Sequence, residues 1–254
     1  MRKHLREHRM EWVGDSQKNR GVTEREFRVE VDGRTVPGVL WTPEEGAKAL
    51  VLLGHGGSNH KRADYILAIA RQLARRHGFA AIAIDGPTHG ARRPGSENGI
   101  EEGPHVQDEF TRLWAADRTL GDAMNADWTG TLNAVQALPG IGNQIPVGYW
   151  GWSLGTLLGL PFVAQEPRIS AATLGLMGTG ETGRLATAAR NMTCPTTFFV
   201  QWDDQLIPRE GALRLFDLIA SDYKRLRACP GDHAETPADE FSAGIEFLVS
   251  QLAR

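Results

Sequence analysis

Cysteine is scarce in this chain: among 254 residues there are only Cys194 and Cys229. Two cysteines do not form a disulfide framework, and neither has a second cysteine at the spacing of a metal site. In the strand pattern described below, one begins a parallel strand and the other ends its neighbour. That separation is too large for a disulfide, which needs α-carbons within about 7 Å. We therefore expect two free thiols.

Long apolar runs and an excess of basic charge are also missing. No run approaches the roughly 18 apolar residues of a membrane span, and the basic N-terminus lacks the apolar core of a signal peptide. We therefore expect a mature, cytoplasmic protein. The 28 basic residues are balanced by 31 acidic ones, which argues against a nucleic-acid surface and favours a small neutral or weakly charged partner.

The length and the 41% content of hydrophobic residues are sufficient for one buried core. We expect a single domain over residues 23–254. The charged segment 1–22 is expected to pack on this domain or to extend it.

Periodicity along the chain predicts an α/β fold. Two alternating runs, 26–31 and 35–41, flank Asp32-Gly33, which is a strong hairpin signal. Six apolar runs follow, separated by helical patterns, as is typical of a parallel sheet covered by helices on both faces. The prediction is a mostly parallel eight-stranded sheet, flanked by helices, with an N-terminal antiparallel hairpin. The apolar runs are 49–54, 79–85, 146–150, 171–175, 196–201 and 225–229, and the helices are expected at 62–77, 113–139, 154–164, 210–219 and 237–252.

Two segments are the least predictable part of the chain. Residues 86–109 are rich in glycine, proline and charge, and we expect a long loop or small insertion that contributes to a pocket above the sheet. The second segment, 177–193, lies between two predicted strands that are only about twenty residues apart. That length is too short for a large cap domain.

A G-x-S-x-G pattern occupies residues 151–155, directly after an apolar strand and directly before a helix. In this setting the pattern is typical of a nucleophile elbow, a sharp turn that holds the serine hydroxyl exposed and leaves no room for side chains at the glycine positions. Ser153 is therefore the candidate nucleophile. The alternative is a glycine-lined structural turn.

A serine nucleophile needs a base, and the base needs a carboxylate to orient it. His233, in PGDH after the last strand, is the only histidine that follows Ser153 in the sequence. Asp204, in WDDQLIP after the preceding strand, is the candidate acid, with Asp203 and Glu181 as alternatives. The order serine, acid, histidine matches the order in the α/β-hydrolase fold.

Acyl transfer also needs N–H donors aimed at the oxygen that becomes negative. Leu154, the residue after the nucleophile, is one candidate for this oxyanion hole. Gly57 is the first choice for the other, and Ser58 is the second, in the HGGS segment after the third strand. Ser58, Trp152 and His89 are candidates for substrate contact, with a structural role favoured for His89.

No metal or cofactor is expected. His55 and His60 have no third ligand at metal spacing. The segment GHGGSNHK lacks the second glycine and the lysine of a P-loop, and it lacks the third glycine of a dinucleotide site.

The blocks LLGHGG, AIDGPTHG, GYWGWSLG, WDDQLIP and PGDH resemble those of the α/β-hydrolase superfamily, specifically its compact dienelactone-hydrolase-like and prolyl-oligopeptidase-like esterases. The resemblance covers roughly residues 25–252. It implies hydrolysis of an ester or related acyl bond without metal or organic cofactor. Dienelactone hydrolases carry cysteine where this chain has Ser153, which argues against that particular activity. Thr156 replaces a second glycine that relatives commonly have, and we expect little effect on mechanism.

The expected function is therefore hydrolysis of a small-molecule carboxylic ester by a serine enzyme. A thioesterase or peptidase is the nearest alternative, because the triad fixes the reaction type and the pocket fixes the leaving group. A hydrolase-fold protein that binds a ligand without catalysis is a third possibility.

Overall fold

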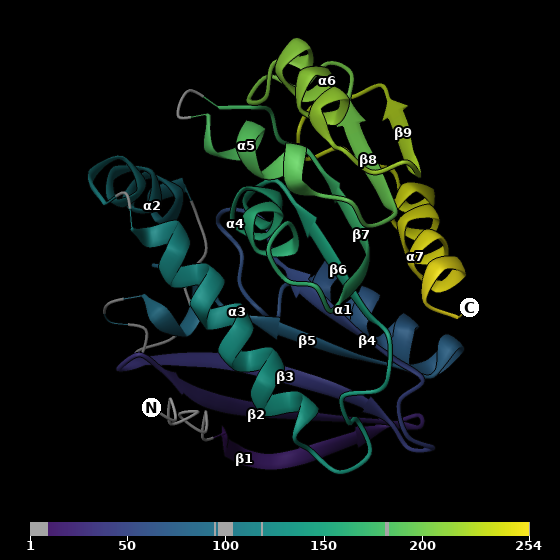
Figure 1. Ribbon diagram of the computed structural model, residues 1–254. Coiled ribbons are helices and arrows are strands. Elements are labelled where there is room, and N and C mark those ends of the chain that lie inside the picture. Colours follow the sequence, from purple (N-terminus) through teal and green to yellow (C-terminus); the bar gives the residue numbers. More distant parts are fainter. Residues whose placement is uncertain (1–9, 94, 96–103, 118, 181–182, 254) are drawn as a thin grey trace, which may run out of the picture.

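The computed structural model describes residues 10–93, 95, 104–117, 119–180 and 183–253. Within them, nine strands form one sheet in the order β1-β2-β3-β5-β4-β6-β7-β8-β9 (Figure 1). The first three strands and the contact of β3 with β5 are antiparallel, and the pairs from β5 to β9 are parallel. The α/β prediction is confirmed. The strands are β1 (Met10–Asn19), β2 (Val22–Val31), β3 (Arg34–Pro43), β4 (Ala49–Gly54), β5 (Phe79–Ile84), β6 (Val147–Trp152), β7 (Ile169–Gly175), β8 (Thr196–Gln201) and β9 (Lys224–Cys229).

The prediction of eight strands was one short in the described residues. The additional strand, β1, lies in the charged N-terminal segment and extends the sheet by pairing with β2. Its residues are mostly exposed, so they lack the apolar alternation that marks a half-buried strand. Main-chain hydrogen bonds and an edge-to-face contact of Trp12 with Phe27, 6.5 Å between ring centroids, hold it in place.

The predicted hairpin is confirmed as β2 and β3. Val31 pairs with Arg34, and the two residues between them, Asp32 and Gly33, both have positive φ, at 49° and 78°. Two left-handed residues in a two-residue loop make the turn whose twist matches that of the flanking strands.

Helices cover both faces of the sheet. Side chains of β4 alternate between two buried clusters: Leu50 and Leu52 pack with α3 to α6, whereas Val51 and Leu53 pack with α1 and α7. Successive side chains of a strand point to opposite faces, so these helix groups lie on opposite sides. The helical elements are α1 (Asp64–Gln72), the π-helical turn η1 (Leu73–His77), the short 3-10 turn η2 (Gly90–Arg92), α2 (Pro104–Ala116), α3 (Leu120–Gln136), α4 (Leu154–Val163), α5 (Arg184–Asn191), α6 (Arg209–Leu218) and α7 (Ala238–Leu252).

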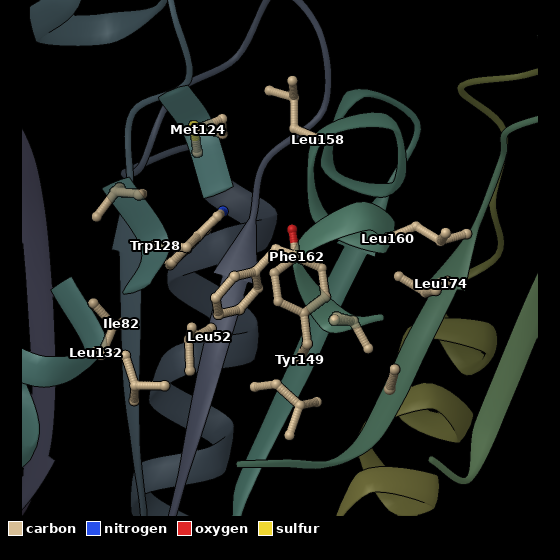
Figure 2. Packing of buried hydrophobic residues seen from close by; sticks show 14 of the residues in the cluster. Leu52, Ile82, Met124, Trp128, Leu132, Tyr149, Leu158, Leu160, Phe162 and Leu174 are labelled. Carbon is tan, nitrogen blue, oxygen red and sulfur yellow. The ribbon is translucent and has the colours of Figure 1, made fainter. Parts of the chain in front are cut away.

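Aromatic rings form the centre of the core between α3, α4 and the sheet. Figure 2 shows Trp128 of α3, Tyr149 of β6 and Phe162 of α4 gathered above Leu52 and Ile82. The ring centroid of Trp128 lies 5.8 Å from that of Tyr149 and 6.1 Å from that of Phe162. This packing fixes β6 against the helix that follows it, and the candidate nucleophile lies between those two elements.

The segment before α3 differs from the prediction. Residues 113–139 were expected as one helix and 86–109 as a loop, but α2 begins at Pro104 and ends at Ala116, separate from α3. Between them, the carboxylate of Asp117 accepts hydrogen bonds from the backbone N–H (2.8 Å) and hydroxyl (2.7 Å) of Thr119. Such a local side-chain bond competes with helix formation and ends α2.

Among the helices that the structure describes, none combines the length and the apolar character needed to cross a bilayer.

Candidate active site

Ser153 lies at the sharp turn between β6 and α4. Its backbone has φ 54° and ψ −117°, a left-handed conformation that is rare for a residue with a side chain. Its N–H donates to the carbonyl of Gly175 at 3.0 Å, which ties the turn to the end of β7. The turn has the geometry of a nucleophile elbow, in which the serine hydroxyl projects away from the sheet.

The glycines on either side of the serine permit this turn. A side chain on Gly151 would collide with the carbonyl of Gly155, and one on Gly155 would collide with the carbonyl of Gly54 at the end of β4. These contacts are with backbone atoms, which cannot move aside as a flexible side chain can. The G-x-S-x-G pattern therefore records two close approaches of the main chain.

Three sequence-predicted residues form one hydrogen-bonded chain. Nε2 of His233 lies 2.9 Å from Oγ of Ser153, and Nδ1 of His233 lies 2.7 Å from Oδ2 of Asp204. An ionised carboxylate only accepts hydrogen bonds, so it pairs with a proton on Nδ1 and leaves the lone pair of Nε2 facing the serine hydroxyl. This arrangement is suited to removing a proton from Ser153.

The carboxylate of Asp204 is fixed by the turn that follows β8. Its Oδ1 accepts the backbone N–H groups of Leu206 and Ile207, each at 2.8 Å, and only 2% of its side chain is exposed. With Oδ1 occupied in this way, Oδ2 faces His233. The neighbouring carboxylate of Asp203 instead accepts the N–H of Gly231 at 3.1 Å.

Asp232 joins the loops after β8 and β9. Its Oδ1 accepts the backbone N–H of His233 at 2.7 Å and that of Gln205 at 2.9 Å. These two hydrogen bonds lower the pKa of the Asp232 carboxyl below its usual value. The loops that carry the acid and the base are thus connected, although sequence analysis did not single out Asp232. Glu181, an alternative acid, lies outside the described residues.

The predicted N–H donors belong to the pocket that Ser153 lines. Leu154 is the first residue of α4, and the first N–H groups of a helix have no partner within it. Gly57 and Ser58, in the loop after β4, line the same pocket as Ser153 and Leu154. Ser58 has a positive φ of 57°, so this loop, like the elbow, follows a constrained path.

A pocket of about 520 Å³ opens above Ser153 and His233. Its lining is largely apolar, and the described residues that form it include no aspartate, glutamate, lysine or arginine. Trp152, a candidate for substrate contact, lines this pocket. The remaining lining residues are Gly56, Gly57, Ser58, Asn59, Tyr65, Gln107, Leu154, Leu157, Leu176, Met177, Leu206, Ile207, Ala234, Thr236 and Phe241.

His89 does not lie where a substrate contact was predicted. It is fully buried and is not part of the pocket wall. Its Nδ1 lies 2.7 Å from the carbonyl of Pro87, and its ring packs between those of His55 and Phe110. Burial lowers the pKa of this imidazole. The position of a residue after a strand predicts that it lies near the site. It does not predict that the side chain reaches the pocket.

The loop after β4 is held from below by buried polar groups. The Asp85 carboxylate accepts the backbone N–H and the ammonium of Lys61, both at 2.8 Å, and the N–H of Ala91 at 2.9 Å. Lys61 is 2% exposed and Asp85 is fully buried. The ion pair therefore connects the loops after β4 and β5. Within the described residues, no cluster of three histidine, cysteine, aspartate or glutamate side chains has the arrangement of a metal site.

Comparison with known proteins supplies the family. No family model matches the sequence, and no curated protein does so either. A cold-adapted esterase from an Arctic intertidal metagenomic library, solved in complex with PEG, is 40% identical, with a TM-score of 0.82, over 95% of this chain and 99% of that one. The chain belongs to the esterases of the α/β-hydrolase superfamily. It is a carboxylic ester hydrolase.

More distant structures share the fold of this esterase. Acetyl xylan esterase 1 from a Thermoanaerobacterium species is 15% identical, with a TM-score of 0.72, over 96% of this chain and 88% of that one. A putative dienelactone hydrolase from Klebsiella pneumoniae is 17% identical, with a TM-score of 0.73, over 92% of this chain and 99% of that one. At this level of identity the likeness concerns the fold alone.

Thr156 has a larger structural role in the esterase than the sequence indicated. It is fully buried, and its hydroxyl lies 2.6 Å from the carbonyl of Gly151 and 2.7 Å from that of Gly175. The same oxygen accepts the N–H of Gly175 at 3.0 Å. The side chain therefore bridges β6 and β7 beneath the elbow. Because this contact joins residues that only the fold brings together, the spacing of residues in the sequence does not indicate it.

Proposed function

We propose that the esterase hydrolyses its substrate through an acyl-enzyme on Ser153, with His233 as the base and Asp204 as the group that orients it. The observation that carries this proposal is the chain of hydrogen bonds from Ser153 through His233 to Asp204, built on a serine with φ 54°. Three groups in this order are what an unactivated hydroxyl requires to become a nucleophile at neutral pH. We also propose that residues 23–254 form one catalytic domain, which β1 extends.

The acylation step follows from these positions. Nε2 of His233 takes the hydroxyl proton as Oγ of Ser153 forms a bond to the carbonyl carbon of the ester. The carbonyl oxygen becomes an oxyanion and accepts hydrogen bonds from the N–H groups of Leu154 and Gly57. When the intermediate collapses, the bond to the alkoxy oxygen breaks, and the imidazolium returns its proton to the departing alcohol.

Deacylation repeats the sequence with water. His233 removes a proton from a water molecule, whose oxygen bonds to the acyl carbon while the N–H groups again hold the oxyanion. The bond from the acyl carbon to Oγ of Ser153 then breaks, and Ser153 regains its proton from the imidazolium. The acid departs, and the free enzyme is restored. None of these steps uses a metal or a redox partner.

The pocket wall favours a small, uncharged ester. Leu157, Leu176, Met177 and Phe241 contribute apolar surface beside the nucleophile, and an ionic group buried there without a partner would lose its hydration. A volume of about 520 Å³ lies within the range of small-molecule sites. The proposed substrate is therefore a small-molecule carboxylic ester.

Intact-mass analysis after incubation with a fluorophosphonate probe tests this function. We expect a single adduct on the wild type and on Ser170→Ala, which removes an exposed serine of β7, and no adduct on Ser153→Ala. A panel of ester, thioester and peptide substrates then separates esterase from thioesterase and peptidase activity. An adduct that persists in Ser153→Ala, or its absence from the wild type, would contradict the proposed nucleophile.

A further inference from the structure

The proposed oxyanion donor at Gly57 lies in a segment with unusual backbone freedom. Gly56 and Gly57 are adjacent, and glycine has more accessible backbone conformations than any other residue. An N–H group that stabilises a developing charge must be held within about 0.5 Å of its working position. Something other than the local sequence must therefore restrain this pair.

Two side chains bind Gly56 from either end of its backbone. Its N–H donates to the phenolic oxygen of Tyr65 at 2.6 Å, and its carbonyl lies 2.8 Å from Nδ1 of His55. The carbonyl of Gly56 and the N–H of Gly57 belong to one planar trans peptide, so fixing the first sets the direction of the second. Both side chains therefore act on the Gly57 N–H through the backbone of Gly56.

The state of His55 is determined by its second hydrogen bond. The N–H of Gly86 donates to Nε2 at 2.8 Å, so Nδ1 carries the proton and donates to Gly56. Burial, together with the nearby His89, lowers the pKa of His55 to about 4. The ring therefore stays neutral, with one donor and one acceptor, throughout the neutral range.

The side chain of Tyr65 is also held in place by its surroundings. It is the second residue of α1, its ring packs 6.1 Å from that of Phe241 in α7, and it forms part of the pocket wall. Its hydroxyl is thereby held between two helices that cover the same face of the sheet. The ring faces the pocket, while the oxygen contacts the main chain of the loop.

We propose that Tyr65 is a positioning residue for ester hydrolysis, whose hydroxyl holds Gly56 and thereby keeps the Gly57 N–H directed at the oxyanion. This inference rests on the proposed function, in which the Gly57 N–H is an oxyanion donor. Tyr65 is outside the proton-transfer chain of Ser153, His233 and Asp204. Its hydroxyl therefore contributes to charge stabilisation in the transition state and leaves proton transfer unchanged.

The test is Tyr65→Phe, which removes one oxygen and keeps the ring in the pocket wall. The matched control is Tyr223→Phe, because Tyr223 is partly exposed and precedes β9, away from the pocket wall. We expect kcat to fall about 10-fold in Tyr65→Phe, with KM within about twofold of the wild-type value. The affinity for a boronic acid, which mimics the tetrahedral intermediate, should fall by a similar factor. The pH profile of kcat should be unchanged.

The concentration of active sites is measured by titration to completion with the fluorophosphonate, and kcat is calculated from that concentration. Unfolded molecules are then not counted and do not lower the measured kcat. A wild-type kcat in Tyr65→Phe, or a change confined to KM, would overturn the positioning role, because the ring or a substrate contact would then account for Tyr65. The two proposals fail separately. Activity that survives in Ser153→Ala overturns the proposed function, whereas loss of activity in Ser153→Ala with full activity in Tyr65→Phe overturns only this inference.

Discussion

The backbone of Gly155 packs directly against the carbonyl group of Gly54, so the first turn of α4 meets the end of β4 without an intervening side chain. In the register of the sheet, Gly54 pairs with Gly151, the residue that opens the elbow. This contact explains why two distant segments converge on one pocket. The loop after β4 leaves the sheet immediately beside the turn that carries Ser153.

A methyl group at this contact should disrupt the elbow. We expect Gly155→Ala to lower the free energy of unfolding by about 1–3 kcal/mol and to reduce hydrolysis, because the backbone of Gly54 must move. Urea denaturation measures the first effect and kcat the second. Gly211→Ala is the control: Gly211 lies in α6, where the new methyl meets only an ordinary contact, and it should be neutral or stabilising by up to about 1 kcal/mol. Equal behaviour of the two variants would refute the packing argument.

The hydroxyl of Thr156 should stabilise the junction of β6 and β7. Thr156→Val keeps the shape of the side chain but leaves the buried N–H of Gly175 without this acceptor. An unsatisfied buried group costs about 1–3 kcal/mol, and we expect a loss of that size in urea denaturation. Thr187→Val, at an exposed position of α5, should change stability by less than about 0.5 kcal/mol. A wild-type stability for Thr156→Val would show that the hydroxyl is dispensable.

The carboxylate of Asp204 should matter more for rate than for folding. In Asp204→Asn, the amide nitrogen can face Nδ1 of His233 and favour the wrong tautomer, so we expect kcat to fall by roughly 10²- to 10⁴-fold. Asp203→Asn is the neighbouring control and should keep kcat near the wild-type value, since Asp203 contacts Gly231 and is not bonded to His233. Steady-state kinetics of both variants separate the two aspartates. A larger loss in Asp203→Asn would assign the acid to that residue.

Buried neutral histidine makes the fold sensitive to acid. Above about pH 6.5, His55 is neutral in both the folded and the unfolded chain. Between 6.5 and about 4, the unfolded chain binds a proton that the folded protein excludes, so the free energy of unfolding decreases as the pH falls. One such group contributes up to about 1.4 kcal/mol per pH unit. Urea denaturation from pH 7.5 to 4.5 should show this slope and a shallower one in His55→Gln. Identical slopes would rule out His55 as its source.

Much of the fold was accessible from the sequence because its strands are buried on both faces. Residues 49–54 and 79–84 are entirely buried, so each is a continuous apolar run between helical patterns. The edge strand β1 was missed, since its pairing depends on main-chain hydrogen bonds rather than apolar side chains. The separation of α2 from α3 was also missed, because Asp117 ends a helix through a local bond that periodicity does not show.

The candidate site divides in the same way. Ser153, Asp204 and His233 were identified because their local patterns and chain order are tied to the chemistry, and the structure brings all three together. Tyr65 and Thr156 were not identified as supporting groups. Each acts by contacting backbone that the fold brings near it, so no spacing in the chain marks its role. His89 shows the converse, a residue at the right end of a strand whose side chain packs into the interior.

Because β9 lies at the edge of the sheet, activity is expected to be lost under milder conditions than those that unfold the core. Four of its six residues are exposed, and it pairs with β8 alone within the described sheet. His233 follows this strand and lies 80 positions from Ser153 along the chain. Elements with few buried contacts open at lower free energy than the core. Separation of β9 from β8 would therefore displace His233, the proposed base, while the aromatic interior remained intact. The rate of hydrolysis therefore measures whether β9 is still paired with the sheet. Activity would be lost before the cooperative unfolding of the core.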